Sequence, residues 1–299
     1  MESFLNVWVL GMLGGTLRYA TPLVLAALGG LVCERSGVVN IALEGLMVVG
    51  AFFAIFGSVT FGHWIFGVLL AVLLGAAFSM LHAVPAITYR ADQIISGTAL
   101  ILIAAGLINF LNLTVMADKG SLSNVSRIPT VQLGALGEIS LLIPATGLLV
   151  AAVWFVLFRT PWGLHLRAVG EHPKAADTVG INVFKIRYMA VAISGAFAGL
   201  AGAYLSFNTG NYSEGMVGGK GFIALAAVIF GKWNPTGAMY ASLLFGFSQA
   251  LGDAMQSAKL PIAPELVTSL PYVITLVALA GFIGKSIPPA AVGKPYAKG

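Results

Sequence analysis

The sequence predicts an all-α protein that crosses a membrane many times, and two observations support this. Of the 299 residues, 58% are hydrophobic and only 9% are charged, whereas soluble domains carry about 25% charged residues. The apolar residues also form runs long enough to cross about 30 Å of hydrocarbon, which requires about 20 helical residues. We expect a polytopic transmembrane bundle of about eight to ten helices, some of them discontinuous. We also expect one membrane domain over residues 1–299.

Seven apolar runs are candidates for membrane-spanning helices. They cover residues 38–57, 64–84, 93–113, 139–158, 188–207, 236–252 and 265–284. Two further runs are less regular, because residues 4–33 contain Arg18 and Pro22, and residues 221–232 are too short to cross alone. The pattern leaves open whether residues 1–20 cross the membrane, cross half of it or lie at its surface.

Small residues recur every four positions in one of these runs. Gly195, Gly199 and Ala203 share one helix face, and this spacing lets helix backbones approach closely in lipid. The pattern predicts a crowded bundle and indicates no activity.

The positions of Lys and Arg predict the orientation. They gather in the loop at about 159–187 and in the C-terminal tail: Arg159, Arg167, Lys174, Lys185, Arg187, Lys285, Lys294 and Lys298. Placing both segments in the cytoplasm puts eleven of the 16 Lys and Arg residues inside, in agreement with the positive-inside rule. We therefore expect a cytoplasmic C-terminus, with Arg127 in an outer loop. The loops also account for the net charge of +5, and no basic cluster interleaved with aromatics indicates nucleic acid.

The sequence lacks the patterns of an enzyme. A phosphate-binding loop requires G-x-x-x-x-G-K-[ST], and residues 284–286 supply only its end because position 279 is Leu. The four histidines do not share metal-ligand spacing with a carboxylate or cysteine. We expect no catalysis, no metal site and no cofactor in this chain.

The most basic loop contains the segment GEHPKAADTVGINV at residues 170–183. Pro173 suits the first turn of a helix, and Gly180 suits a left-handed cap that ends one. The sequence predicts a short amphipathic helix between them, which has little stability in isolation and should be covered by a partner. Ala175 and Ala176 would form its flat contact surface, so a bulky charged residue at 176 should block the partner without unfolding the bundle.

Three ordered motifs carry a resemblance to a known family. Residues 170–183 resemble the coupling loop of permease subunits in ATP-binding-cassette (ABC) importers, although Lys174 replaces the motif's Glu. Residues 34–47 (ERSGVVNIALEGLM) and 221–238 (GFIALAAVIFGKWNPTGA) resemble the N-terminal and C-terminal signatures of the branched-chain amino acid and simple-sugar branch. Within that branch, the segments around residues 36–40, 170–173 and 230–235 look most like permeases of nucleoside importers.

The resemblance implies a four-part machine in a bacterial cytoplasmic membrane. A second permease subunit, expected to be a different chain, would form the other half of the substrate path. A cytoplasmic ATPase subunit would use ATP and Mg²⁺, and an extracytoplasmic lipoprotein would deliver a small-molecule substrate. The residues expected to couple to the ATPase are His172, Pro173, Ala175, Ala176, Asp177 and Gly180.

Polar residues inside the apolar runs indicate where the path lies, because such groups are costly in lipid. Asn40 and Glu44 are four residues apart and would share one face of the 38–57 helix. Residues 34–37 interrupt the apolar run before them, which indicates a discontinuous helix near the path. Glu44 would line the path or act as a structural carboxylate, with Arg35 as one candidate partner.

Further path candidates come from amide and aromatic side chains. Asn109 and Asn112 face similar directions on the 93–113 span, and Asn208 follows the 188–207 span. Amides both donate and accept hydrogen bonds, which suits a base or sugar edge. Phe207 and Phe222 offer flat faces for stacking or for an apolar gate.

Three alternatives remain open at this level. The same family would also accommodate a simple sugar or a branched-chain amino acid. A secondary transporter driven by protons or sodium would use Glu44 or Asp253 as its ion-binding carboxylate. A purely structural membrane subunit is disfavoured, because a scaffold needs neither broken helices nor buried carboxylates.

Overall fold

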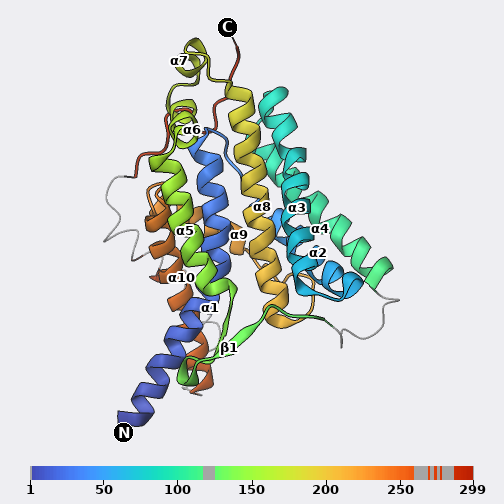
Figure 1. The fold of residues 1–299 in the computed structure, drawn as a ribbon, viewed down its shortest axis with the longest axis vertical. Coiled ribbons are helices and arrows are strands. Elements are labelled where there is room, and N and C mark those ends of the chain that lie inside the picture. Colours follow the sequence, from blue (N-terminus) through green and yellow to red (C-terminus); the bar gives the residue numbers. More distant parts are fainter. Residues whose placement is uncertain are drawn as a thin grey trace.

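The computed structural model describes residues 2–116, 125–258, 269, 273–274, 277 and 286–298. Within them, ten α-helices form one elongated bundle (Figure 1). The helices are α1 (Glu2–Arg35), α2 (Leu43–Phe61), α3 (Trp64–Ala83), α4 (Gln93–Leu111), α5 (Leu142–Arg159), α6 (Pro161–Glu171), α7 (Pro173–Thr178), α8 (Val183–Thr209), α9 (Lys220–Phe230) and α10 (Pro235–Ser257). The predicted all-α bundle is confirmed.

Short irregular elements join some of these helices. Single π-helical turns extend α3 and α4, at Val84–Thr88 and Asn112–Met116. The strands β1 (Thr130–Gln132) and β2 (Glu138–Ser140) pair antiparallel, with Val131 opposite Ile139. They form a small hairpin at the end of the bundle where the N-terminus lies (Figure 1).

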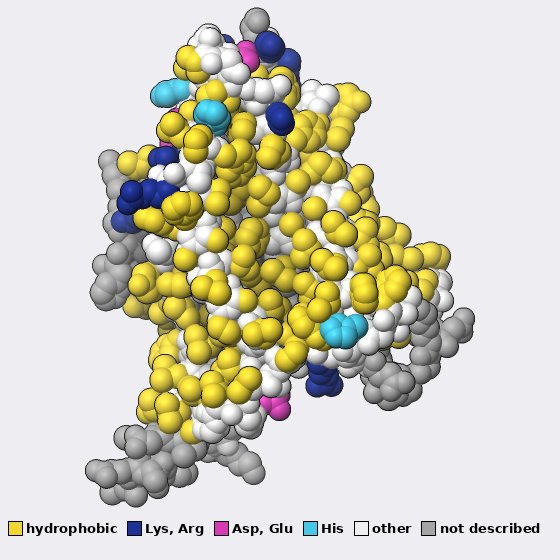
Figure 2. Space-filling model, viewed as in Figure 1, with side chains coloured by type: hydrophobic (Ala, Val, Ile, Leu, Met, Phe, Trp, Pro, Cys, Tyr) yellow, Lys and Arg dark blue, Asp and Glu magenta, His cyan; other side chains and the backbone are white. Residues whose placement is uncertain are grey.

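Six helical segments are long and apolar enough to cross a membrane. They are Val9–Arg35, Leu43–Phe61, Trp64–Thr88, Gln93–Val115, Leu142–Arg159 and Val183–Thr209. Hydrophobic side chains cover most of the visible face at mid-height, and Lys and Arg lie mainly toward the end that carries α6 and α7 (Figure 2). The protein is therefore a multi-pass membrane protein.

The structure refines the bounds of the predicted helices. Residues 2–20, whose placement the sequence left open, belong to α1, which runs through Pro22 as one helix of 34 residues. The expected 38–57 helix begins only at Leu43, since Gly37 has a left-handed φ of 92° and an irregular segment follows it. The 236–252 span corresponds to α10, which contains several Ser residues and Asp253 and is not among the six apolar segments. The 265–284 span lies almost entirely outside the described residues.

Close backbone packing holds the centre of the bundle, where α8 contacts α1, α2 and α3. A Cβ added to Gly195 would lie 2.3 Å from the Gly75 carbonyl oxygen, and one added to Gly50 would lie 2.2 Å from the Gly199 carbonyl oxygen. Only glycine permits these distances. The small residues predicted to pack helices closely therefore do so, with α2 and α3 as the partners of α8.

Replacement of Gly199 with Ala is expected to lower the midpoint of thermal unfolding by several degrees. The new Cβ would lie 2.2 Å from the Ala71 carbonyl oxygen, a backbone atom that cannot rotate away. Separating α3 from α8 costs about 1–3 kcal/mol. Gly106→Ala is the matched control, because no atom lies within 4 Å of its added Cβ. Equal midpoints for the two purified variants would contradict this account of the packing.

The helices α6 and α7 and the C-terminal segment 286–298 lie together at one end of the bundle (Figure 1). The amide of Ala291 donates to the carbonyl of Gly170, 2.9 Å away, which joins the C-terminal segment directly to α6. The loop at 159–187 and the tail therefore share one side of the membrane, as their charges predicted. This end is called the coupling end below.

Candidate functional site

The segment predicted to form a short helix at the coupling end does so. It begins with Pro173 in the first turn and ends at Thr178, and Gly180 follows with a left-handed φ of 87°. The amides of Gly180 and Ile181 donate to the carbonyls of Asp177 and Ala176, which closes the last turn. The preceding helix α6 was not predicted, because residues 161–171 are short and only moderately apolar.

The outward face of α7 differs from the prediction in one respect. Ala176 does not form a contact surface: its side chain is 4% exposed and belongs to the hydrophobic core. A bulky charged residue at 176 would disturb the packing of α7 against the bundle. Such a variant therefore does not separate a loss of partner docking from a local loss of structure. Ala175 is exposed, and Val179, just after the helix, is 74% exposed. Val179 was missed because the sequence does not show which side of so short a helix meets the bundle.

The remaining predicted coupling residues occupy different environments. His172 and Gly180 are exposed at the two ends of α7, and Pro173 is half-buried between them. Asp177 is also half-buried and bonds with Tyr296 of the C-terminal segment. The structure therefore presents a small surface of α7 to solvent, with its acidic residue turned toward the tail.

Glu44 lies where two helix N-termini meet. Its Oε1 accepts from the amide of Gly219 at 2.8 Å, and its Oε2 accepts from the amide of Gly221 at 2.7 Å. A carboxylate is favoured there because the first amides of a helix lack partners and carry partial positive charge. Glu44 also stands in the first turn of α2. Its carboxylate therefore joins α2 to the short helix α9.

Arg35 is not the partner of this carboxylate. Its Nε donates to the carbonyl of Trp233 at 2.9 Å. The tight contact of α9 with Glu44 depends on glycine, because a Cβ on Gly221 would lie 2.4 Å from the Glu44 nitrogen. The short helix α9, which follows a glycine-rich connection, matches the expectation of discontinuous helices in the bundle.

Asn40 does not share a helix face with Glu44, contrary to the prediction. It lies in the irregular segment before α2, because the chain leaves α1 through the left-handed Gly37. Its side chain is fully buried, and its Nδ2 donates to Ser194 Oγ of α8 at 2.9 Å. Asn40 therefore fastens the connection between α1 and α2 to α8, and its place in a path stays a prediction.

The other predicted path residues are dispersed. Asn109 is half-buried and donates to Glu214 at 2.5 Å, and Asn112 is half-buried one turn further along. Phe207 is 4% exposed and belongs to the same buried hydrophobic cluster as Ile128. Phe222 is 47% exposed on α9. Within the described chain, the structure does not bring these four side chains together into one site, although Phe207 lines a cavity with Asn208, another predicted path residue.

Two adjacent cavities lie near the hairpin end and share Tyr204 and Asn208 of α8. The first is about 250 Å³ and is lined by Arg127, Ile128, Thr130, Glu138, Ser140, Tyr204, Phe207 and Asn208. The second is about 270 Å³ and is lined by Arg18, Tyr19, Pro22, Tyr204, Leu205, Asn208, Thr209, Met216 and Lys220. Their walls combine aromatic rings, amides and cations.

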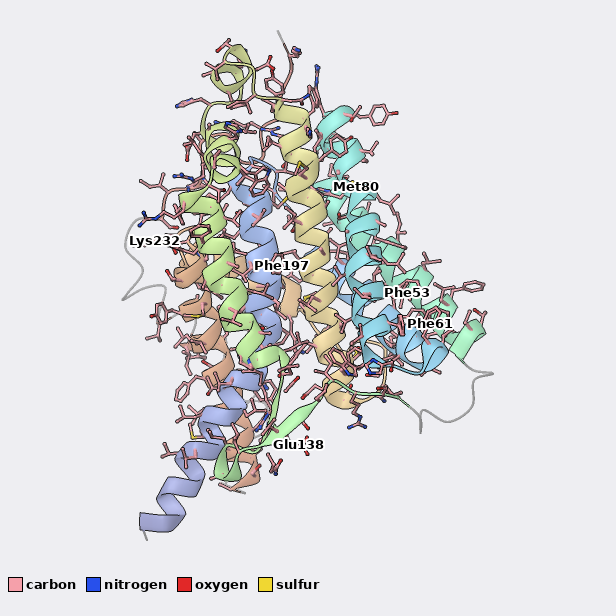
Figure 3. The ribbon with its side chains drawn as sticks, in the orientation of Figure 1. Phe53, Phe61, Met80, Glu138, Phe197 and Lys232 are labelled. Atoms are coloured by element: carbon pink, nitrogen blue, oxygen red, sulfur yellow. The ribbon has the colours of Figure 1, made fainter. Side chains whose placement is uncertain are left out.

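Sequence reasoning missed most of this wall. Tyr204 and Asn208 are four residues apart and so share one helix face, a signal that was present in the sequence. Tyr19 is brought to the same place by α1, more than 180 residues away in the chain, and no local pattern indicates that contact. Glu138, on the hairpin, marks the hairpin end in Figure 3.

Among the described residues, no group of three or more His, Cys, Asp or Glu side chains is arranged to hold a metal ion. His82, one of these residues, has hydrogen-bond partners within the bundle. Its Nε2 bonds to the carbonyl of Val39 at 2.9 Å and its Nδ1 to Ser96 Oγ at 3.1 Å. This histidine holds the segment before α2 between α3 and α4.

Comparison with known proteins agrees with the motifs and the bundle. Residues 12–279 match the family described as branched-chain amino acid transport system / permease component. The chain is 43% identical to the guanosine ABC transporter permease protein NupQ of Bacillus subtilis, over 95% of each chain. It is 42% identical to the nucleoside ABC transporter permease protein NupC of Lactococcus lactis, over 94% of this chain and 95% of the relative.

A third relative differs in the substrate for which it is named. The chain is 34% identical to a putative glucose ABC transporter permease protein of Haloferax volcanii, over 90% of this chain and 91% of the relative. No solved structure matches the chain. With its multi-pass bundle, its exposed helix α7 and a family match over most of its length, this chain belongs to the branched-chain amino acid permease family and is a permease component of an ABC importer.

Proposed function

We propose that this chain forms half of the path by which an ABC importer carries a nucleoside across a bacterial cytoplasmic membrane. The observation that carries the substrate assignment is the pair of relatives named for guanosine and nucleosides, each more than 40% identical over at least 94% of this chain. The relative named for glucose is less similar. It makes a sugar the second candidate.

In this proposal the chain is not itself an enzyme. A cytoplasmic ATPase subunit uses ATP and Mg²⁺ and binds at the coupling end, where Ala175 of α7 and Val179, just after the helix, are exposed. The coupling end and the C-terminus are therefore cytoplasmic, and the hairpin end receives substrate from an extracytoplasmic binding lipoprotein. A second permease subunit, a different chain, completes the path.

The cavities at the hairpin end support a nucleoside as cargo. Tyr19, which is half-buried, offers a ring on which a base can stack. Asn208 lies in the wall shared by both cavities and can donate to and accept from a base or a ribose. A path built from such groups binds weakly, which suits a permease whose selectivity comes from a separate receptor.

The test is uptake by the complete importer reconstituted in vesicles. Each labelled substrate is supplied together with the binding lipoprotein: guanosine, adenosine, uridine, glucose or leucine. ATP is either present or absent on the side of the vesicle membrane where the ATPase lies. We expect ATP-dependent uptake of a nucleoside and no uptake of glucose or leucine. Glucose uptake would replace the nucleoside assignment, and uptake driven by an ion gradient without ATP would overturn the proposal.

A further inference from the structure

The C-terminal segment 286–298 returns to the coupling end and packs beside α6 and α7 (Figure 1). The amide of Ala291 donates to the carbonyl of Gly170 at 2.9 Å, and the amide of Ala290 donates to Glu171 Oε2 at 3.1 Å. Ala291 is buried. The segment is therefore attached at the junction between α6 and α7 and does not simply trail from the bundle.

Arg187 fastens the same segment to the core. This side chain is 1% exposed, and its Nε donates to the carbonyl of Ser36 while its Nη1 donates to the carbonyl of Lys294, each at 3.2 Å. The amide of Gly293 adds a bond to the carbonyl of Gly37 at 3.2 Å. One guanidinium can serve several acceptors because its donors point in fixed, different directions. Arg187 thus joins α8, the break between α1 and α2, and the C-terminal segment.

Tyr296 fastens the end of the segment to α7. Its side chain is 4% exposed, its ring lies edge-on to Phe184 with centroids 5.6 Å apart, and its hydroxyl bonds with Asp177. Desolvation, together with the bond to Asp177, raises the pKa of Tyr296 above that of a free tyrosine. A tyrosine hydroxyl is protonated near neutral pH, so Tyr296 donates this bond to the Asp177 carboxylate.

Between α7 and this segment lies a groove of about 520 Å³. It is lined by Glu171, His172, Pro173, Lys174, Ala175, Ala290, Ala291, Lys294, Pro295, Tyr296 and Ala297. The start of α7 forms one wall, and the C-terminal segment forms the other. Lys174 and Lys294 place positive charge on the two sides, and the one carboxylate of the lining, Glu171, accepts the amide of Ala290. The groove therefore favours a partner element that is acidic or that presents the C-terminal end of a helix.

We propose that the surface on which the ATPase subunit docks is composite, formed by α7 together with the C-terminal segment 286–298, and that Tyr296 and Arg187 position this segment. The inference rests on the proposed function. Because the segment also bonds to Gly37, a displacement of α7 reaches the break between α1 and α2 without passing through α8. Asn40 and Glu44 follow that break in the chain. Asn40 bonds to α8, and Glu44 bonds to the start of α9.

The first test compares variants at Tyr296 in the assembled importer. Tyr296→Ala removes the ring contact with Phe184 and the bond with Asp177, and is expected to lower the ratio of substrate-stimulated to basal ATP hydrolysis about tenfold. Tyr296→Phe keeps the ring and should lower it about threefold. Tyr240→Ala is the matched control, because Tyr240 is 67% exposed on α10. Yield and thermal unfolding of the permease pair without ATPase are measured alongside, since a merely structural role would change those and leave the ratio intact.

The second test measures contact directly and does not disturb the buried anchors. Ala297→Cys places a thiol at an exposed position of the segment, and Val131→Cys places one on the hairpin at the opposite end. The native Cys33 is fully buried and stays unreactive. We expect a short cross-linker with one thiol-reactive and one amine-reactive end to join the Ala297→Cys variant to lysines of the ATPase subunit in the purified complex. The same reagent should leave the Val131→Cys variant without a bond to the ATPase subunit.

The outcomes separate the two proposals. If substrate stimulates ATP hydrolysis in the wild-type complex, but Tyr296→Ala couples normally or Ala297→Cys gives no cross-linked ATPase, the composite surface is wrong. Cross-linking of Ala297→Cys to an anionic lipid that carries an amine, and to no ATPase, would likewise overturn it. If the wild-type complex binds no ATPase and shows no stimulation by any substrate, the proposed function fails instead.

Discussion

Replacement of Val179 with Asp is expected to lower substrate-stimulated ATP hydrolysis by the assembled importer about 100-fold. Val179 follows α7 directly and is 74% exposed, although it is apolar. When the ATPase covers this side chain, burial of its apolar surface favours docking. An aspartate there would lose its hydration without gaining a partner, which costs several kcal/mol. The measurement is ATP hydrolysis in vesicles with and without the substrate-loaded lipoprotein.

Two variants serve as controls for this result. Val179→Thr keeps the branched shape and adds no formal charge, so it should reduce coupling only a few-fold. Val131→Asp introduces the same charge at an exposed position on the hairpin, at the end of the bundle away from α7, and should leave coupling intact. If Val179→Asp retains full stimulation while the ATPase remains bound, α7 is not the docking helix.

Replacement of Glu44 with Gln is expected to lower uptake about tenfold or more. Each carboxylate oxygen of Glu44 accepts one backbone amide, from Gly219 and from Gly221. Glutamine has one acceptor oxygen, so its NH₂ group would face a second donor and leave one amide without a partner. The substitution also removes the negative charge that the N-termini of α2 and α9 favour. Initial uptake rates, normalised to the amount of permease in the membrane, give the measurement.

Asp92→Asn is the matched control, because Asp92 also holds a helix N-terminus. A single oxygen of Asp92, Oδ1, accepts from both Ile94 and Ile95 at the start of α4. Asparagine caps helices about as well as aspartate, so this variant should transport normally. Unchanged uptake by Glu44→Gln at normal membrane levels would show that the junction of α2 and α9 is not needed for transport.

The coupling helix shows how far local sequence patterns reach. Pro173 and Gly180 mark the ends of α7, and the structure has the helix between them. Capping preferences act over a few residues, so they can be read from sequence. The burial of Ala176 could not be read in the same way. It depends on how α7 sits against the rest of the bundle, which a six-residue helix does not encode in its own periodicity.

The path residues show the opposite case. Glu44 was identified because a carboxylate inside an apolar run is costly. Its partners, the amides of Gly219 and Gly221, lie about 175 residues away and belong to the backbone, so no side-chain pattern points to them. Asn40 was assigned to the wrong element because hydropathy continues across the irregular segment that follows Gly37.

The sequence by itself determined that this protein is a multi-pass helical membrane protein, which family it resembles, and that its most basic loop lies on the same side as its tail. Hydropathy, charge placement and short motifs carry this information because each acts locally or along a single helix. Only the tertiary structure decided that Glu44 joins α2 to α9, and that Arg187 and Tyr296 hold the C-terminal segment beside α7. Those contacts join segments far apart in the chain, and packing of the whole bundle selects them.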